Sequence, residues 1–146
     1  MTSILQISNT LIPEDDAWFS KVGRYERLPQ GAVLIREGEP TQTLTFILNG
    51  VVSISVAGIG EIARAANGEI VGEMSLLHES LPFATVTAAE AVDVLTIGRR
   101  ELQAKLESDP KFASRFYRMM ALFLSVRLRR TIERFDQERK SANRAE

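Results

Sequence analysis

The spacing of the apolar residues changes once along this chain, and the change divides the chain into two parts. Between residues 32 and 97, short apolar runs alternate with turns that contain glycine. From Arg99 to Lys140 the apolar residues recur with helical spacing instead. Short strands separated by glycine turns are typical of a closed or sandwiched antiparallel sheet. The sequence therefore predicts a mainly β fold with flanking helices.

Short strands are expected throughout the first part, each bounded by turn-forming residues. They are placed at residues 32–36, 44–48, 51–56, 61–65, 83–88 and 92–97. Asn49-Gly50 is a strong hairpin sequence, and it predicts that the strands on either side of it pair with each other. Further turns are expected at Gly58, at Gly60 and at Asn67-Gly68, because glycine permits tight reversal of the chain.

A short helix is expected before the strands, at residues 13–22. Pro13 suits the first helical turn, and the acidic residues that follow it suit the positive end of the helix dipole. Gly23 provides the stop. The buried side of this helix is expected to consist of Trp18, Phe19 and Val22.

The C-terminal part is expected to form a helix at residues 99–107 and a long one at 110–140. Ser108 or Asp109 caps the long helix. One apolar row consists of Phe112, Phe116, Met119, Phe123 and Val126, and a second of Met120, Leu124, Leu128, Ile132 and Phe135. One row can cover the sheet, and the other needs a partner, most simply a second copy. We therefore expect a homodimer through residues 112–135, with contacts from Phe116, Met120, Phe123, Leu124, Leu128 and Ile132.

Composition excludes several classes of protein. The 146 residues are 45% apolar and 25% charged, which is typical of one soluble domain. The absence of cysteine excludes disulfides, thiolate chemistry and cysteine-based zinc sites. No long apolar run and no basic leader followed by an apolar stretch are present, so we expect no membrane span, no secretory signal and a cytoplasmic location.

Charge is divided unevenly along the chain. Residues 1–98 hold 5 basic and 12 acidic residues, whereas residues 99–146 hold 13 basic and 7 acidic ones. Such asymmetry can mark a basic tail for nucleic acid or a membrane. Acidic residues interrupt the basic part, however, so a solvated helix with mixed charges is the simpler interpretation.

Enzyme chemistry finds no support in the sequence. No Ser/His/Asp or Cys/His set, no Walker-type loop and no metal-ligating cluster occurs at suitable spacing, so we expect no enzyme, no catalytic residue and no metal site. The single histidine, His78, is expected to be a solvated loop residue rather than a catalyst or pH switch. The pair Met119-Met120 is expected to serve packing.

A series of short motifs, in order and at matching spacing, resembles the cyclic-nucleotide-binding domain of catabolite activators and protein kinase A regulatory subunits. The motifs are Gly31, residues 35–39 (Ile-Arg-Glu-Gly-Glu), 46–50, 68–73, Leu76-Leu77, 84–86 (Ala-Thr-Val) and 94–97. The resemblance implies an antiparallel jelly-roll β-barrel at about 24–98, followed by a long C-terminal helix. It implies one domain over residues 1–140, and we expect residues 141–146 to form a disordered tail.

The resemblance also implies a phosphate-binding cassette at residues 68–87, with one part missing. In the family, the residue at Glu73 binds the ribose 2′-hydroxyl, while backbone amides and an arginine hold the cyclic phosphate. Pro82 or Phe83 stands where that arginine is expected, and Arg64 is the candidate substitute cation. The expected ligand-binding residues are Gly72, Glu73, Met74, Ser75, Pro82, Phe83, Ala84 and Thr85. The candidate ligands are cAMP and cGMP, and the missing arginine argues against both.

Two functions remain open at this level. The first is a non-catalytic regulatory sensor that binds a nucleotide or other small effector weakly and signals through its C-terminal helix to a protein partner or dimer mate. The second is a non-binding interaction scaffold whose pocket is filled by Phe83, with Glu73 only accepting hydrogen bonds inside a retained turn. No helix-turn-helix follows the long helix, so we expect no direct DNA binding.

Overall fold

The computed structural model describes residues 10–78 and 80–145, apart from the side chain of Ser75. The helices and strands predicted from the sequence occur in the predicted order, together with two further strands and one further short helix. They are α2 (Pro13–Val22), β1 (Arg24–Leu28), β2 (Val33–Ile35), β3 (Thr43–Asn49), β4 (Val52–Val56), β5 (Gly60–Ala65), β6 (Ile70–Val71), α3 (Glu73–His78), β7 (Thr85–Ala88), β8 (Val92–Gly98), α4 (Arg99–Ser108) and α5 (Pro110–Arg144).

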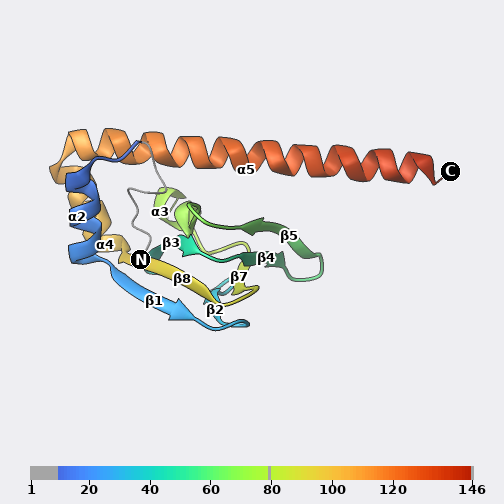
Figure 1. Cartoon of the computed structure of the whole chain (residues 1–146), viewed down its shortest axis with the longest axis horizontal. Coiled ribbons are helices and arrows are strands. Elements are labelled where there is room, and N and C mark those ends of the chain that lie inside the picture. The colour runs from blue at the N-terminus through green and yellow to red at the C-terminus, as the bar shows by residue number, and fades with distance from the viewer. Residues whose placement is uncertain (1–9, 79, 146) are drawn as a thin grey trace.

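The strands form two antiparallel four-stranded sheets that face each other as a jelly-roll barrel. Their strand orders are β1-β8-β3-β6 and β2-β7-β4-β5. Figure 1 shows α5 as a straight rod along one side of this barrel, with α2 and α4 gathered near the N-terminal end of the rod. The fold class expected from the sequence, mainly β with a long C-terminal helix, is confirmed.

Two hydrophobic clusters hold these layers together. One fills the space between the sheets and includes Ile47, whereas the other lies between the β1-β8-β3-β6 sheet and the helices and includes Leu44, Phe46 and Leu48. Strand β3 contributes side chains to both clusters because successive side chains of a strand point to opposite faces. The helical cluster also contains Phe19, so the sheet positions α2 and α5 through one shared core.

The hairpin predicted at Asn49-Gly50 is wrong. Strand β3 pairs with β6 and β8, whereas β4 pairs with β5 and β7, so the chain crosses from one sheet to the other here. Gly50 has φ +108°, and a Cβ added to it would lie 2.6 Å from Val92 Cγ1. The glycine therefore permits a tight crossing against β8 rather than a two-stranded turn. The turn at Gly58 and Gly60 does join two paired strands, β4 and β5.

We expect Gly50→Ala to lower the free energy of unfolding by about 2 kcal/mol, from left-handed backbone strain and the clash with Val92. Gly58→Ala is the matched control, since Gly58 has φ +81° but no atom within 4 Å of an added Cβ. Its cost is expected to be about 1 kcal/mol, from the backbone alone. Urea unfolding of both variants measures the difference, and equal losses would show that close packing at Gly50 is unimportant.

Strand β1 was not predicted, although it pairs with β8 along its whole length. Its sequence, Arg-Tyr-Glu-Arg-Leu, contains too much charge to show an apolar alternation. One of these charged residues, Arg27, forms an ion pair with Asp93 of β8, and Arg27 Nη1 lies 3.0 Å from Asp93 Oδ1.

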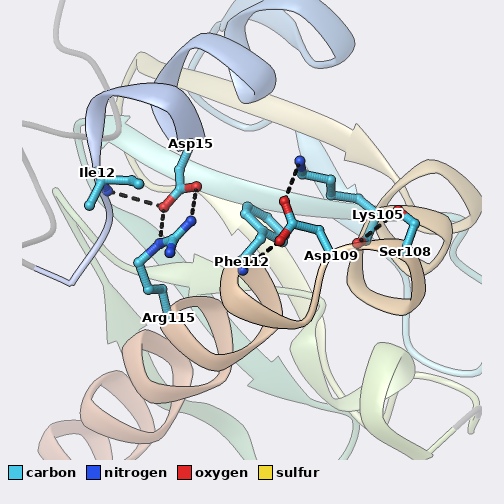
Figure 2. Close-up of polar contacts among 7 residues, drawn as sticks. All are labelled: Ile12, Asp15, Lys105, Ser108, Asp109, Phe112 and Arg115. Atoms are coloured by element: carbon cyan, nitrogen blue, oxygen red, sulfur yellow. Dashed lines mark hydrogen bonds and ion pairs between the residues drawn. The ribbon is translucent and has the colours of Figure 1, made fainter.

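Helix α5 is anchored at its N-terminal end by both polar and apolar contacts. Asp109 caps the helix by accepting a hydrogen bond from the Phe112 N–H at 3.1 Å, and Lys105 Nζ lies 3.0 Å from the same carboxylate (Figure 2). Arg115 forms a two-point ion pair with Asp15 of α2, at 2.7 and 2.8 Å. The buried residues of α5 are Phe112, Phe116, Met119 and Met120.

The rest of α5 extends past the barrel, and its last turns lie beyond the β4–β5 hairpin (Figure 1). The helix continues through Arg144, whereas the sequence predicted a disordered tail from residue 141. Just before this extension, Asp136 pairs with Arg139 at 2.6 Å and with Lys140 at 3.0 Å, one turn away, which supports the helix up to residue 140. Among the described residues, no helix has the length and hydropathy needed to cross a membrane.

Candidate ligand-binding site

A cavity of about 390 Å³ lies between the barrel and α5. Its volume is in the usual range of small-molecule sites. One wall comes from the barrel and α3, and includes Ile35, Ile54, Val71 and Val86. The opposite wall comes from α5 and consists of Leu124, Arg127, Thr131 and Phe135. Most of this lining is apolar, so a bound molecule would contact hydrocarbon on several sides and a few polar groups at fixed points.

The polar group on the barrel side is Glu73, the first residue of α3. Gly72 turns the chain from β6 into α3 with φ +92°, and a Cβ added there would lie 3.0 Å from the Thr43 carbonyl oxygen. Glycine therefore lets the chain pass close to β3 and places Glu73 beside the cavity. The Glu73 side chain is buried, with 8% of its surface exposed.

The polar groups on the helix side are Arg127 and Thr131. Arg127 Nη1 donates to Glu73 Oε1 at 2.7 Å, and Nη2 donates to the Ile70 carbonyl oxygen at 2.6 Å. The third nitrogen, Nε, is buried and has no hydrogen-bond partner among the described residues. The Thr131 hydroxyl donates to the Arg127 carbonyl oxygen at 3.0 Å, which leaves its lone pairs as acceptors.

Two more arginines of α5 contact the barrel beside the cavity. Arg130 pairs with Glu69, whose other oxygen accepts the Ala66 N–H at 2.5 Å. Arg134 Nη1 donates to the Ile62 carbonyl oxygen at 2.8 Å. Acidic side chains of the barrel therefore pair with basic side chains of α5. The sequence predicted a solvated helix of mixed charge, whereas part of the basic face of α5 contacts the barrel.

The match to a known family follows the same elements. A family model described as the cyclic nucleotide-binding domain matches residues 25–109, from β1 to the end of α4, which is more than half of the chain. The chain belongs to the cyclic nucleotide-binding domain family. The resemblance noted in the sequence motifs is thereby confirmed.

Relatives of this cyclic nucleotide-binding domain include potassium channels and kinase regulatory subunits. It is 33% identical over 93 residues to a cyclic nucleotide-gated potassium channel of Mesorhizobium japonicum, covering 64% of this chain and 25% of the channel. It is 33% identical over 70 residues to a cAMP-dependent protein kinase regulatory subunit of Debaryomyces hansenii, covering 48% of this chain and 16% of the subunit. The chain spans between 16% and 35% of the length of six curated relatives that it matches.

The fold of the domain also matches solved structures. A crystal structure of a cyclic nucleotide-binding domain from Methylobacillus flagellatus superposes with a TM-score of 0.83 at 26% identity, covering 92% of this chain and 82% of that one. The high coverage means that the similarity extends beyond the barrel to most of the helices.

The structure brings most of the predicted cassette residues to the cavity. Those that line it are Gly72, Glu73, Met74, Pro82, Phe83 and Ala84. Thr85 does not, because its hydroxyl instead accepts a hydrogen bond from the Glu37 N–H at 3.1 Å. The side chain of Ser75 lies outside the described part of the domain.

Arg64 is not the substitute cation that the sequence proposed. It does not line the cavity, and its Nε lies 2.9 Å from Glu61 Oε1 on an exposed surface. Its neighbours Ala63 and Ala65 belong to the cluster between the sheets, so strand alternation directs Arg64 to the opposite face. The cation at the cavity is Arg127, from a helix that the sequence assigned to other contacts.

Phe83 does not fill the pocket. Its side chain lines the cavity, yet the residue is 53% exposed and the cavity remains open. The backbone next to Phe83 is tied to the β2–β3 connection, because the Pro82 carbonyl oxygen accepts the Gly38 N–H at 2.8 Å. The alternative of a pocket filled by Phe83 is therefore wrong.

The residues predicted for a helix partner divide into separate groups. Phe116 and Met120 are buried in the domain's own core, so their assignment to a partner surface is wrong. Phe123 packs partly against the same core, and Leu124 lines the cavity. Leu128 and Ile132 are exposed. The two Met residues pack in the core as expected, and His78 is exposed at the end of α3.

Sequence reasoning missed the cavity residues of α5. Arg127, Thr131 and Phe135 follow one another at intervals of four, which places them on one helix face with Leu124. That spacing, together with the opposite charges of barrel and helix, is the signal that could have found them. In the described part of the domain, no cluster of three or more His, Asp or Glu residues could hold a metal ion.

Proposed function

We propose that this domain is a regulatory module that binds a cyclic nucleotide, weakly or with atypical geometry, between its barrel and α5. The observation that supports the proposal is the cavity itself, which has the cassette on one side and α5 on the other. A ligand in this position contacts both parts at once. Its binding energy can therefore favour one position of α5 over another, which is the requirement for signalling through the helix.

The lining suits the parts of a nucleotide. Apolar side chains from the barrel can contact the faces of a base and a sugar, while the Glu73 carboxylate can accept a hydrogen bond from a ribose hydroxyl. Arg127 can donate to an anionic phosphate, and the Thr131 hydroxyl can hydrogen-bond to the edge of a base. Two relatives, a cyclic nucleotide-gated channel and a cAMP-dependent kinase regulatory subunit, support this ligand class.

Calorimetric titration with cAMP, cGMP and cyclic dinucleotides tests the proposal. We expect heat of binding for at least one of these ligands. The affinity is expected to be only micromolar to submillimolar, because the cassette lacks its barrel arginine. Absence of heat for all of them at millimolar concentration would contradict it. That result would favour the second candidate, a scaffold that binds no nucleotide and acts only through its helix surface.

The module is further proposed to signal as a homodimer or through a protein partner of α5. The observation in favour is a stripe on α5 with heptad spacing, made of Ala121, Ser125, Leu128 and Ile132. Its two large members, Leu128 and Ile132, are 61% and 58% exposed, although they would be buried in a helix pair. The cytoplasmic location expected from the sequence stays a prediction.

Light scattering coupled to size exclusion tests the dimer. We expect a mass of twice the 16.3 kDa chain for the unmodified domain, and dissociation for Leu128→Glu because a buried carboxylate would interrupt the seam. Leu122→Glu is the matched control, since Leu122 is 51% exposed but lies outside the heptad stripe. A mass of one chain for the unmodified domain at high concentration would contradict the dimer.

A further inference from the structure

The barrel side of the cavity carries a negative charge and no positive one. Glu73 is its acidic group, and the chain has no lysine or arginine between Arg64 and Arg99. Pro82 and Phe83, which stand where a cation is expected, offer only hydrocarbon. A nucleotide phosphate placed here by the barrel alone would meet Glu73 without compensation. A positive partner must therefore come from another element.

Arg127 meets the geometric requirements for that partner. It lines the cavity, and its guanidinium is mostly buried, with 18% of the side chain exposed. Two of its donor nitrogens are engaged by Glu73 and by the Ile70 carbonyl oxygen, but the buried Nε is not paired within the described residues. Arg127 carries five N–H donors, and a planar guanidinium that lines an apolar cavity is well suited to bind a phosphate.

Building on the proposed function, we infer that Arg127 of α5 replaces the missing barrel arginine as the phosphate-binding residue, and that the phosphate competes with Glu73 for it. The ligand class is a nucleotide with an anionic cyclic phosphodiester. Before binding, Arg127 joins α5 to the barrel through Glu73. After binding, the phosphate accepts hydrogen bonds from the Arg127 guanidinium, and the Glu73 carboxylate becomes free to accept hydrogen bonds from the sugar hydroxyls.

This arrangement makes the position of α5 part of ligand recognition. The N-terminal end of α5 is fixed by the buried core and by the Asp15–Arg115 pair. Beyond Leu124, the helix contacts the barrel through Arg127, Arg130 and Arg134. An exchange of partners at Arg127 therefore acts on the part of α5 whose arginines hold it to carboxylates and backbone carbonyls of the barrel.

Titration calorimetry with cAMP and cGMP on variants of the full chain tests the inference. Arg127→Gln is expected to raise Kd by roughly 30-fold or more, because it removes a charge-assisted pair. Arg64→Gln, an arginine outside the cavity, is expected to change Kd by less than about twofold. Adding Pro82→Arg to Arg127→Gln returns a cation to the barrel side, and we expect it to recover roughly tenfold of the lost affinity.

Each outcome has a distinct meaning. If the unmodified chain binds neither cAMP nor cGMP at millimolar concentration, the inference fails, and the proposed function fails with it when cyclic dinucleotides also give no heat. If the unmodified chain binds and Arg127→Gln binds equally well, the proposed function stands and the inference is overturned. Thermal unfolding verifies that the variants fold. Should Arg127→Gln not fold, Arg127→Lys decides, with a roughly tenfold weaker Kd expected from loss of the guanidinium fork and an unchanged Kd overturning the inference.

Discussion

Phe19→Ala is expected to lower the free energy of unfolding by about 4 kcal/mol, the largest effect of any single change considered for this domain. Phe19 is fully buried and its ring lies at the centre of an aromatic group. Its centroid is 5.1 Å from the rings of Trp18 and Phe46, 5.8 Å from Phe112 and 6.4 Å from Phe116. These rings come from α2, β3 and α5, so the vacated space would lie where three elements meet and cannot close easily.

Denaturant unfolding measures this effect, with Phe83→Ala as the matched control. Phe83 loses the same atoms on substitution but is 53% exposed, so its cost is expected to be below about 1 kcal/mol. If the two variants lost equal stability, the aromatic group would not be what holds α2 and α5 on the sheet.

Asp15→Asn is expected to cost about 3 kcal/mol at neutral pH. The carboxylate is 3% exposed and accepts two hydrogen bonds from Arg115, at 2.7 and 2.8 Å, and one from the Ile12 N–H at 3.1 Å (Figure 2). Removing one partner of a buried pair leaves the other charge uncompensated. This expected cost is at the low end of the range for buried ion pairs, because the Arg115 side chain is 26% exposed and water can reach it.

The loss should depend on pH in a defined direction. Burial alone raises the pKa of Asp15, but the hydrogen bonds and the charge of Arg115 outweigh it and hold this pKa below the ordinary value of 3.8. A lowered pKa in the folded state means that the stabilisation is complete above the unfolded pKa and is lost as pH falls through the folded one. The stability difference between the parent and Asp15→Asn is therefore expected to be constant above about pH 5 and to shrink below about pH 4.

Asp93→Asn is the control for the buried pair, because Asp93 also faces an arginine across two oxygens, at 3.0 and 3.2 Å from Arg27 Nη1. That pair is exposed on the β1–β8 surface, with 68% of the Arg27 side chain accessible. Its loss is expected to cost less than about 1 kcal/mol. A cost for Asp15→Asn as small as that for Asp93→Asn would show that burial adds nothing to the first pair.

Local sequence signals were sufficient for most of the elements. Helix α2 has the predicted bounds because Pro13 and the acidic first turn act within the helix itself. The pairing of β3 was not predictable in the same way. Asn49-Gly50 satisfies a local hairpin rule, but β3 gains its partners from β6 and β8, which are distant in sequence. The pairing of β3 with β6 and β8 is therefore determined by the burial of both faces of β3 and not by the turn sequence that follows it.

Half of the candidate site was predictable from motifs and half was not. The cassette side, with Gly72 and Glu73, is contiguous in sequence and was found from residue order. The α5 side depends on how a long helix rotates about its axis when it packs, which fixes whether Arg127 faces the barrel or the solvent. The charge imbalance between the two parts of the chain contained this information, because α5 arginines meet barrel carboxylates in Glu69 and Glu73. Charge alone did not select Arg127 over its neighbours.

The most direct test is a crystal structure of the full chain grown with cAMP or cGMP, whichever gives heat in calorimetry. We expect the cyclic phosphate within hydrogen-bonding distance of the Arg127 guanidinium, with the base against the apolar wall near Thr131 and the contact from Arg127 to Glu73 loosened. A phosphate held by another guanidinium, or by backbone amides of α3 while Arg127 stays paired with Glu73, would contradict the central claim that α5 supplies the cation of this site.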